Sequence, residues 1–419
     1  MSPQLPTGIH LVDQPEEFRS RLLSWFEREG RSLPWRRDRS LYGTWVSEMM
    51  LQQTTVSVVE PYWLRFMARF PDVRSLAAAP EEEVLSHWSG LGYYRRARHL
   101  HAAAVRVVED LGGELPGDRE AWLDLPGVGP YASGAISSIG LGLREPAIDA
   151  NARRVLSRWL LSDPVLFPEL KSAHLDAVGR ELVDPHRPGD WNEALMELGA
   201  LVCVAGSPRC GNCPMGELCR AGKARTAEKI PPPKTSATTI PVELALLVVL
   251  WNDRILLMPP DCPPVAQFQG NENPVRGNLK GLLGGLWGLP AGPWLPRSDQ
   301  GATQLEVKIW KPFIELLSTW QDVDIKEDPV LVGSFPHAIT KYRLNVRVYG
   351  IRLPEIAGTR EGAPRGDEPD IRGWTVELDL EKRETGPGPV ARFCRWPRPR
   401  HPVSNLVAKS MAQIAKSSV

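Results

Sequence analysis

The stretch that decides the fold of this 419-residue chain is LPGVGPYASGAISSIGLGLREPAIDAN, residues 125–151. It opens on Pro126-Gly127-Val128-Gly129, where two residues without a Cβ predict a sharp backbone turn that can approach a partner closely. The small residues from Ala132 to Gly140 predict a helix directly after the turn. Because the first N–H groups of a helix and its positive dipole end favour anions, the stretch predicts a phosphate-binding hairpin.

A carboxylate follows the hairpin closely in sequence. Ile148-Asp149-Ala150-Asn151 precedes the apolar residues Val155, Leu156 and Trp159, whose spacing predicts a helix with Asp149 as its N-cap. These residues alone are equally compatible with a plain glycine turn and an ordinary capped helix.

Length and composition bound the remaining possibilities. A chain of this length predicts two domains, and the longest strongly apolar run, residues 244–251, is too short to span a bilayer. Acidic residues near the amino terminus are unlike a signal peptide, so we expect a cytoplasmic protein with no membrane association. Since the formal net charge is zero, binding to nucleic acid would depend on local patches.

Four of the six cysteines lie close together, in the pattern C-x6-C-x2-C-x5-C. In an intracellular chain this spacing favours a metal site over disulfides, and four thiolates without histidine suit zinc or an iron–sulfur cluster. Spacing alone does not decide between the two. The four candidate ligands are Cys203, Cys210, Cys213 and Cys219.

Glu48 is a lone acidic residue in the apolar part of an expected helix over residues 44–54. The ordinary interpretation of such a residue is that it lies exposed on the solvent-facing side of the helix. The functional interpretation is a partly desolvated carboxylic acid whose pKa is raised, so that it holds a proton near neutrality.

Further helices are expected over residues 18–29, 76–88, 97–111 and 191–199. Between two of them, residues 89–96 combine two glycines with Tyr93, Tyr94, Arg95 and Arg96. Such a loop could meet a nucleic-acid strand through stacking or wedging rings and phosphate-binding arginines, or it could simply be packed aromatics beside solvated charges.

The chain changes character after a proline-rich linker over residues 230–240. Residues 242–250 and 343–353 are typical of β-strands, whereas residues 312–320 and 403–414 predict helices. We therefore expect a helical first half and an α+β second half.

Six ordered stretches resemble the MutY-type adenine DNA glycosylases of the helix-hairpin-helix superfamily: WVSEMMLQQTTV, GLGYYRRAR, LPGVGPYASGAI, AIDANARRVL, WNEALMELGALVC and the four-cysteine pattern. The resemblance implies an all-α glycosylase domain over residues 1–229, with a [4Fe-4S] cluster held by residues 203–219. It also implies a Nudix-like domain over residues 241–419 that recognises 8-oxoguanine, in which GLLGGLWGLP, residues 281–290, looks like the glycine-rich strand turn.

The resemblance implies that the protein, as a monomer, removes adenine from double-stranded DNA that carries 8-oxoguanine:adenine or guanine:adenine mispairs. The base must leave the stack, and its loss needs one protonated and one ionised carboxyl group. By resemblance, the residues that act on the sugar and base are Glu48, Asp149, Tyr131 and Asn151, those that bind adenine are Glu193, Arg36 and Leu51, and those that contact DNA are Gln53, Tyr93, Gly127, Val128 and Gly129.

Three other functions are weighed against this one. A glycosylase/lyase of the endonuclease III type needs a lysine just after the hairpin, where this chain has Tyr131, so we expect a monofunctional enzyme. An active Nudix pyrophosphatase would need clustered glutamates just after residue 290, and residues 291–297, AGPWLPR, contain none. A dead scaffold that only binds DNA would have lost Glu48 or Asp149, and both are present.

The chain departs from the family where 8-oxoguanine would be read. Ile339, Thr340 and Lys341 occupy positions at which the resemblance implies phenylalanine, serine and histidine. Ile339 cannot stack on a base as phenylalanine can, and Lys341 has a mobile cation in place of the directional imidazole of histidine. We expect a weaker, more salt-sensitive preference for the lesion; the alternative is an ordinary β-hairpin with no reading role.

Overall fold

The computed structural model describes residues 15–161, 172–232, 239–251, 254–257, 289, 291–296, 310, 314–315, 318, 325, 328–339, 342–353, 392–395 and 405–414. The chain divides into two compact units, residues 1–87 with 95–235 and residues 88–94 with 236–419. In the part that the structure describes, no helix is both long and apolar enough to cross a membrane.

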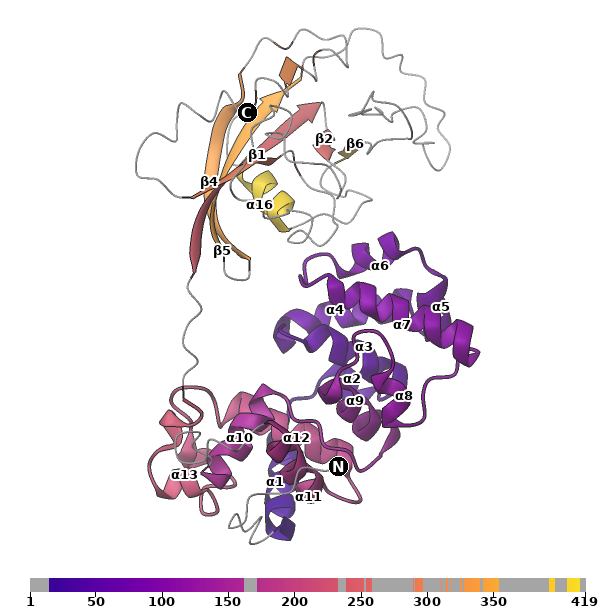
Figure 1. Cartoon of the computed structure of the whole chain (residues 1–419), viewed down its shortest axis with the longest axis vertical. Coiled ribbons are helices and arrows are strands. Elements are labelled where there is room, and N and C mark those ends of the chain that lie inside the picture. The colour runs from indigo at the N-terminus through magenta and orange to yellow at the C-terminus, as the bar shows by residue number, and fades with distance from the viewer. Residues whose placement is uncertain are drawn as a thin grey trace. The chain divides into compact units, whose positions relative to one another are not determined.

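The first unit is built of helices (Figure 1). The expected helices over residues 18–29, 44–54, 97–111 and 191–199 are confirmed, each with slightly different ends. The elements are α1 Pro15–Glu29, α2 Pro34–Arg37, α3 Leu41–Leu51, α4 Val56–Arg69, α5 Val73–Ala78, α6 Glu81–Trp88, α7 Arg95–Leu111, α8 Arg119–Leu123, α9 Pro130–Ala135, α10 Ala150–Leu160, α11 Ser172–Leu182, α12 Pro188–Leu201 and α13 Arg220–Lys223, with short 3-10 turns at Cys210–Asn212 and Ala227–Lys229.

Two helix predictions need correction. The single helix expected over residues 76–88 is wrong, because Ala79 leaves the helical region (ψ 145°) before Pro80 and the chain restarts as α6. The small-residue helix after the hairpin is confirmed in position, but α9 is short and continues as a π-helix, η1 Ile136–Gly140. A π-helix has no simple sequence signal.

Two groups of packed helices make up this unit, and η1 contacts helices of both. In one group, Phe18 of α1 packs on Trp159 of α10 with ring centroids 4.5 Å apart. In the other, Trp45 of α3 packs on Trp122 of α8 at 5.3 Å. Because α3 and α12 both contact η1, side chains from the two groups meet there.

The second unit contains a mixed β-sheet whose strands run in the order β4-β5-β1-β2-β6, with β3 also paired to β1. β1 and β5 are parallel, with Ile240 opposite Tyr342, and the other pairs are antiparallel. The two expected strands and the last expected helix are confirmed. The elements are β1 Ile240–Trp251, β2 Arg254–Leu257, β3 Ala291–Pro296, β4 Val330–Ile339, β5 Tyr342–Arg352, β6 Arg392–Arg395 and α16 Asn405–Ile414, which packs against β4.

Several predictions fall outside the described residues. These are most of the linker, residues 233–238, most of the expected helix over residues 312–320, and all of residues 281–290 except Leu289.

Candidate active site

Glu48 is buried in the middle of α3, and the interpretation as an exposed surface residue is wrong. The Ser40 hydroxyl caps the helix by accepting the Gly43 N–H at 2.9 Å. The Glu48 side chain is 5% exposed, and its Oε2 accepts a 2.7 Å hydrogen bond from the Tyr131 hydroxyl. The expectation of a desolvated acid in an apolar turn is therefore confirmed.

Burial raises the pKa of Glu48 to about 7. The Tyr131 hydrogen bond opposes this shift because it favours the ionised form, whereas the negative charges of Glu193 and Asp149 add to it. A carboxyl group with this pKa is partly protonated near neutral pH and can donate a proton.

Asp149 caps α10, as the sequence predicts. Its Oδ1 accepts the Ala152 N–H at 2.6 Å, and its Oδ2 accepts the Asn151 side-chain amide at 3.0 Å. Burial raises the pKa of Asp149, while these hydrogen bonds lower it. Because each oxygen receives a donor, the local structure supports the carboxylate form.

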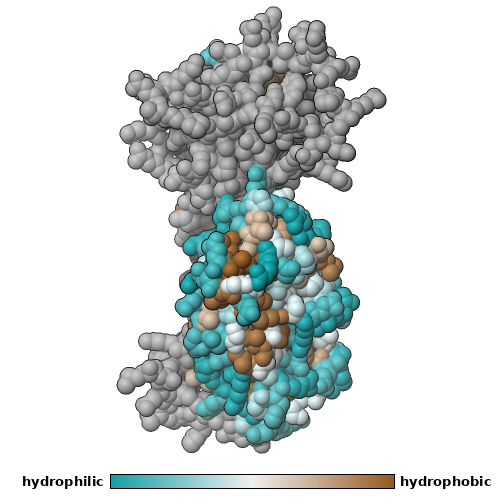
Figure 2. Space-filling view, turned by 90° about the vertical axis from the view of Figure 1, so that its right-hand side faces the viewer, coloured by the Kyte–Doolittle hydropathy of each residue, from teal (hydrophilic) through white to brown (hydrophobic). Residues whose placement is uncertain are grey.

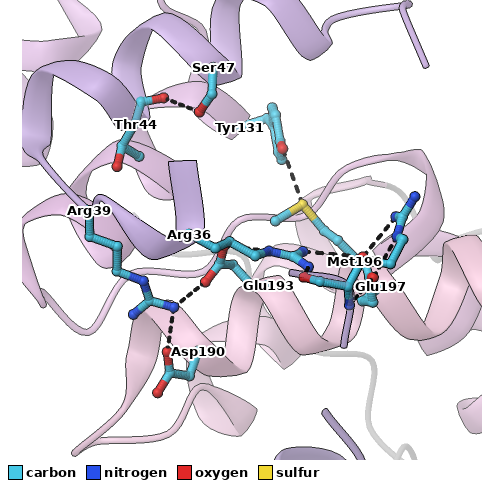
Figure 3. Close-up of polar contacts among 10 residues, drawn as sticks. Arg36, Arg39, Thr44, Ser47, Tyr131, Asp190, Glu193, Met196 and Glu197 are labelled. Atoms are coloured by element: carbon cyan, nitrogen blue, oxygen red, sulfur yellow. Dashed lines mark hydrogen bonds and ion pairs between the residues drawn. The ribbon is translucent and has the colours of Figure 1, made fainter. Parts of the chain in front are cut away.

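Tyr131 lies in the first turn of α9, directly after Pro130. Its hydroxyl lies 3.1 Å from the Met196 sulfur of α12 (Figure 3). The same hydroxyl makes the 2.7 Å hydrogen bond to Glu48. Burial and the nearby charge of Glu48 raise the phenol pKa well above its usual value. Tyr131 therefore stays a neutral hydrogen-bond donor.

The loop that leads to Asp149 is held by Asn192, a residue that the sequence analysis does not single out. Its fully buried amide accepts the Ala147 N–H and donates to the Glu145 carbonyl and the Ser138 hydroxyl, each at 2.8 Å. Asn192 therefore fixes the backbone two residues before Asp149. It precedes Glu193 on α12.

Glu193 is 4% exposed and lies in a group of arginines and carboxylates (Figure 3). Its Oε1 accepts a 2.9 Å hydrogen bond from Nε of Arg36, and its Oε2 accepts one from Arg39. Burial raises the pKa of Glu193, and the two arginines lower it.

Glu197 lies one turn further along α12 and is 2% exposed. Arg31 donates to both of its oxygens, at 2.7 and 2.8 Å, and Arg36 donates at 3.1 Å. Burial raises the pKa of Glu197, but these donors lower it more, to about 2. The sequence signal for this group is a pair of glutamates four residues apart on an apolar helix, together with a run of arginines before α3.

Gln53 lies in a strained turn after α3, whose last residue is the half-buried Leu51. The side chain of Gln53 is exposed and its φ is +59°. Buried Arg96 supports this turn, because its guanidinium donates to the carbonyls of Met49, Met50 and Gln52 and, at 3.0 Å, to the Thr54 hydroxyl.

Tyr93 belongs to the short segment of residues 88–94. The residue is 56% exposed, and its φ of +50° is unusual for an aromatic residue.

The hairpin glycines differ in their roles. Gly127 has φ +79°, and a Cβ added there would lie 2.6 Å from Cβ of His99, so this position needs glycine. The expectation that Gly129 is needed for the same turn is wrong: its backbone is extended (φ −96°, ψ −179°). A Cβ at Gly129 would meet nothing within 4 Å, so that position instead leaves open space beside the start of α9, while Val128 is buried.

The four cysteines surround one cavity of about 350 Å³, whose wall also includes Arg158. The Arg158 guanidinium donates to Sγ of Cys203 at 3.3 Å, and the Gly222 N–H donates to Sγ of Cys219 at 3.4 Å. Burial raises the pKa of the Cys213 thiol to about 12, and the other three cysteines add to this shift. Within the described ranges, no three His, Cys, Asp or Glu side chains converge closely enough for one metal ion.

The residues expected to read 8-oxoguanine are described only in part. Ile339 is the last residue of β4, whereas Thr340 and Lys341 lie outside the described residues. Their reading role stays a prediction.

Comparison with known proteins places this geometry in a family. Residues 46–177 match the family described as HhH-GPD superfamily base excision DNA repair protein. The chain is 48% identical over 215 residues to the adenine DNA glycosylase of Mus musculus, covering 49% of this chain and 41% of the mouse protein. It is 36% identical over 379 residues to that of Homo sapiens, covering 82% of this chain and 68% of the human protein.

Among solved structures, that of a thermostable thymine-DNA glycosylase is similar with a TM-score of 0.47 and 29% sequence identity, over 50% of this chain and 97% of the other. The chain thus spans less than half of the mouse relative's length and about two thirds of the human relative's. On its match to the human protein, the chain belongs to the adenine DNA glycosylases of the HhH-GPD superfamily.

Proposed function

We propose that this protein removes adenine mispaired with 8-oxoguanine or guanine in double-stranded DNA, by hydrolysis of the N-glycosidic bond in base excision repair. The observation that carries the proposal is the buried acid Glu48, which has a pKa of about 7 and a hydrogen bond from Tyr131. A proton donor of this kind suits a leaving group that departs readily only when it is protonated.

In the proposed reaction, Glu48 gives its proton to a ring nitrogen of adenine and the C1′–N9 bond breaks with its electron pair on the base. Asp149, held ionised by Ala152 and Asn151, stabilises the cation that develops on the sugar. A water molecule then adds to C1′ and loses a proton to the Glu48 carboxylate. The products are free adenine and an abasic site.

We further propose that adenine reaches this site by leaving the helix stack, with Gln53 and Tyr93 entering the gap. The exposure of both side chains supports this role. Backbone N–H groups of the hairpin at Gly127, Val128 and Gly129 would bind a phosphate, and the open space beside Gly129 would admit it. Arg36, Leu51 and Glu193 would contact the adenine. We propose that the protein acts on DNA as a monomer.

The direct test is incubation of the pure protein with a duplex that carries one 8-oxoguanine:adenine pair, followed by alkali to cut at abasic sites. We expect adenine-strand cleavage after alkali, and also with a guanine:adenine pair. A duplex with thymine in place of adenine is the control. No base loss from either mispair would refute the proposed activity.

Cys203, Cys210, Cys213 and Cys219 fit a [4Fe-4S] cluster, which we propose as the cofactor. All four cysteines line one cavity of about 350 Å³, whose size suits a cluster better than a single zinc ion. Bound thiolates would supply iron ligands and brace the loop of residues 203–219. The nearby cations Arg209, Arg220 and Lys223 could then meet DNA phosphates.

We expect about four iron atoms per chain in the purified protein, with brown absorbance that is lost in Cys213→Ala. Metal analysis by mass spectrometry measures this directly. Stoichiometric zinc without iron would contradict the assignment.

We expect the enzyme to release adenine without cutting the strand, because the Tyr131 hydroxyl cannot form an imine with the opened sugar. The measurement is borohydride trapping with the 8-oxoguanine:adenine duplex. Efficient trapping of a covalent protein–DNA adduct would count against this expectation.

The single-turnover excision rate should fall as the pH rises above about 7, because Glu48 must be protonated to act and its pKa lies there. On the acid side the rate should fall as Asp149 takes up a proton, at a pH above its usual range because burial raises its pKa. A rate that keeps rising through alkaline pH would show that Glu48 is not the acid.

For the second unit, with its mixed sheet and α16, we propose a Nudix-like domain over residues 241–419, joined by a linker over residues 230–240, that surveys the base opposite adenine. Ile339, at the end of β4, and the adjoining Thr340 and Lys341 are the proposed reading residues. Comparing 8-oxoguanine:adenine with guanine:adenine binding across salt concentrations in wild type, Thr340→Ala and Lys341→Ala tests this. An unchanged salt slope and preference would remove these residues from the proposal.

A further inference from the structure

The arginines around Glu193 are each shared with a second carboxylate. Arg36 reaches Glu193 through Nε at 2.9 Å and Glu197 through a terminal nitrogen at 3.1 Å. Arg39 likewise bridges Glu193 and Asp190, the latter at 2.8 Å. Each arginine therefore gives Glu193 one nitrogen rather than the paired nitrogens of its planar fork (Figure 3).

This sharing has a chemical consequence for Glu193. Arginine usually binds a carboxylate with two parallel N–H groups, which occupy both oxygens. Here each Glu193 oxygen has one arginine donor in the described structure, so each has capacity for a further donor. A buried carboxylate with spare acceptor capacity suits a base with an exocyclic amino group.

Glu197 accepts a hydrogen bond from Arg36 and so holds Arg36 in this arrangement. It is itself fixed by Arg31, which donates to both of its oxygens and whose backbone N–H donates to Oε1 at 3.0 Å. The remaining terminal nitrogen of Arg36 donates to the Arg31 carbonyl at 3.0 Å. All three guanidinium nitrogens of Arg36 are therefore engaged, and only one of them contacts Glu193.

We propose that Glu197 is a positioning residue that holds Arg36 away from a two-nitrogen pair with Glu193, and so keeps Glu193 free to accept the amino group of the excised base. The proposal rests on the proposed function, in which Glu193 contacts adenine. Without Glu197, the terminal nitrogen of Arg36 loses its acceptor and can turn onto Glu193. The site would then lose preference for a base with an amino group.

The test compares single-turnover excision of adenine and of unsubstituted purine, which lacks the amino group, each opposite 8-oxoguanine. In Glu197→Met, which keeps the length of the side chain but removes the acceptor, we expect the adenine/purine rate ratio to fall about tenfold or more, since a hydrogen bond to a charged group is lost. Because single Glu197→Met leaves Arg31 without its anion, the double variant Arg31→Gln/Glu197→Met removes one charge of each sign and serves if the single variant does not fold. Arg69→Gln/Glu83→Gln, which removes the 2.6 Å ion pair between α4 and α6, is the matched control and should keep the wild-type ratio.

A double-mutant cycle with Glu193→Gln separates positioning from general destabilisation. If Glu197 acts through Glu193, Glu197→Met lowers the ratio in the wild-type background but not in the Glu193→Gln background. A wild-type ratio in folded Arg31→Gln/Glu197→Met, or an equal fall in both backgrounds, overturns the proposal.

Two other results would contradict the proposed function rather than the role of Glu197 alone. If Glu193→Gln itself keeps the wild-type ratio, Glu193 does not read the base, and the positioning role falls with it. If the wild-type protein excises neither base, the glycosylase activity itself is refuted.

Discussion

Glu48→Gln should lose adenine excision by about 10² to 10⁴ in single-turnover rate while duplex binding is nearly unchanged, because the amide keeps the shape but has no acidic proton to give. A poor leaving group places the loss at the upper end of this range. The Tyr131 hydroxyl, which donates to Oε2 at 2.7 Å, can still donate to the amide oxygen, so the fold should persist.

The measurement is the excision rate at saturating enzyme, with affinity for the same duplex measured separately. Glu83→Gln, on the surface ion pair with Arg69, is a control for the loss of one glutamate charge. A wild-type rate in Glu48→Gln would show that another group protonates the base.

Asp149→Asn should be comparably damaging, because it removes the negative charge that stabilises the developing sugar cation; losing one such electrostatic group typically costs about 10² to 10³ in rate. Asparagine is itself a good N-cap, and its oxygen can still accept the Ala152 N–H that Asp149 accepts at 2.6 Å. The loss should therefore appear in the rate and not in the melting temperature.

Asp118→Asn provides the matched control, since Asp118 caps α8 by accepting the Ala121 N–H at 2.9 Å and has no proposed part in the reaction. Thermal unfolding of both variants should resemble that of the wild type. If Asp149→Asn excises adenine at the control's rate, its charge has no part in the chemistry.

Local features of the site could be predicted from the sequence because they depend on neighbouring residues. The N-cap at Asp149 follows from an aspartate placed before an amphipathic helix, and the suspicion about Glu48 follows from its apolar neighbours. The positive φ of Gly127 follows from a glycine in a short turn. Gly129 shows the limit of this reasoning, since its glycine is not required by backbone geometry.

Features that depend on long-range pairing could not be predicted. The carboxylates of Glu193 and Glu197 meet arginines about 160 positions earlier in the chain, and nothing in either segment specifies that they pair. The parallel pairing of β1 with β5 likewise joins strands about 100 residues apart. Strand patterns indicate that a residue faces a core, but they do not identify the neighbouring strand.

The turn after α3 has a consequence for the entropy of DNA binding. Arg96 donates to the carbonyls of Met49, Met50 and Gln52, directly before Gln53, so the left-handed backbone of Gln53 is set in the free protein. A side chain that enters a gap in DNA from such a turn loses little backbone freedom on binding, because that freedom is already lost on folding. The cost of opening the duplex then falls mainly on the unstacking of the DNA itself, which is smallest at a mispair.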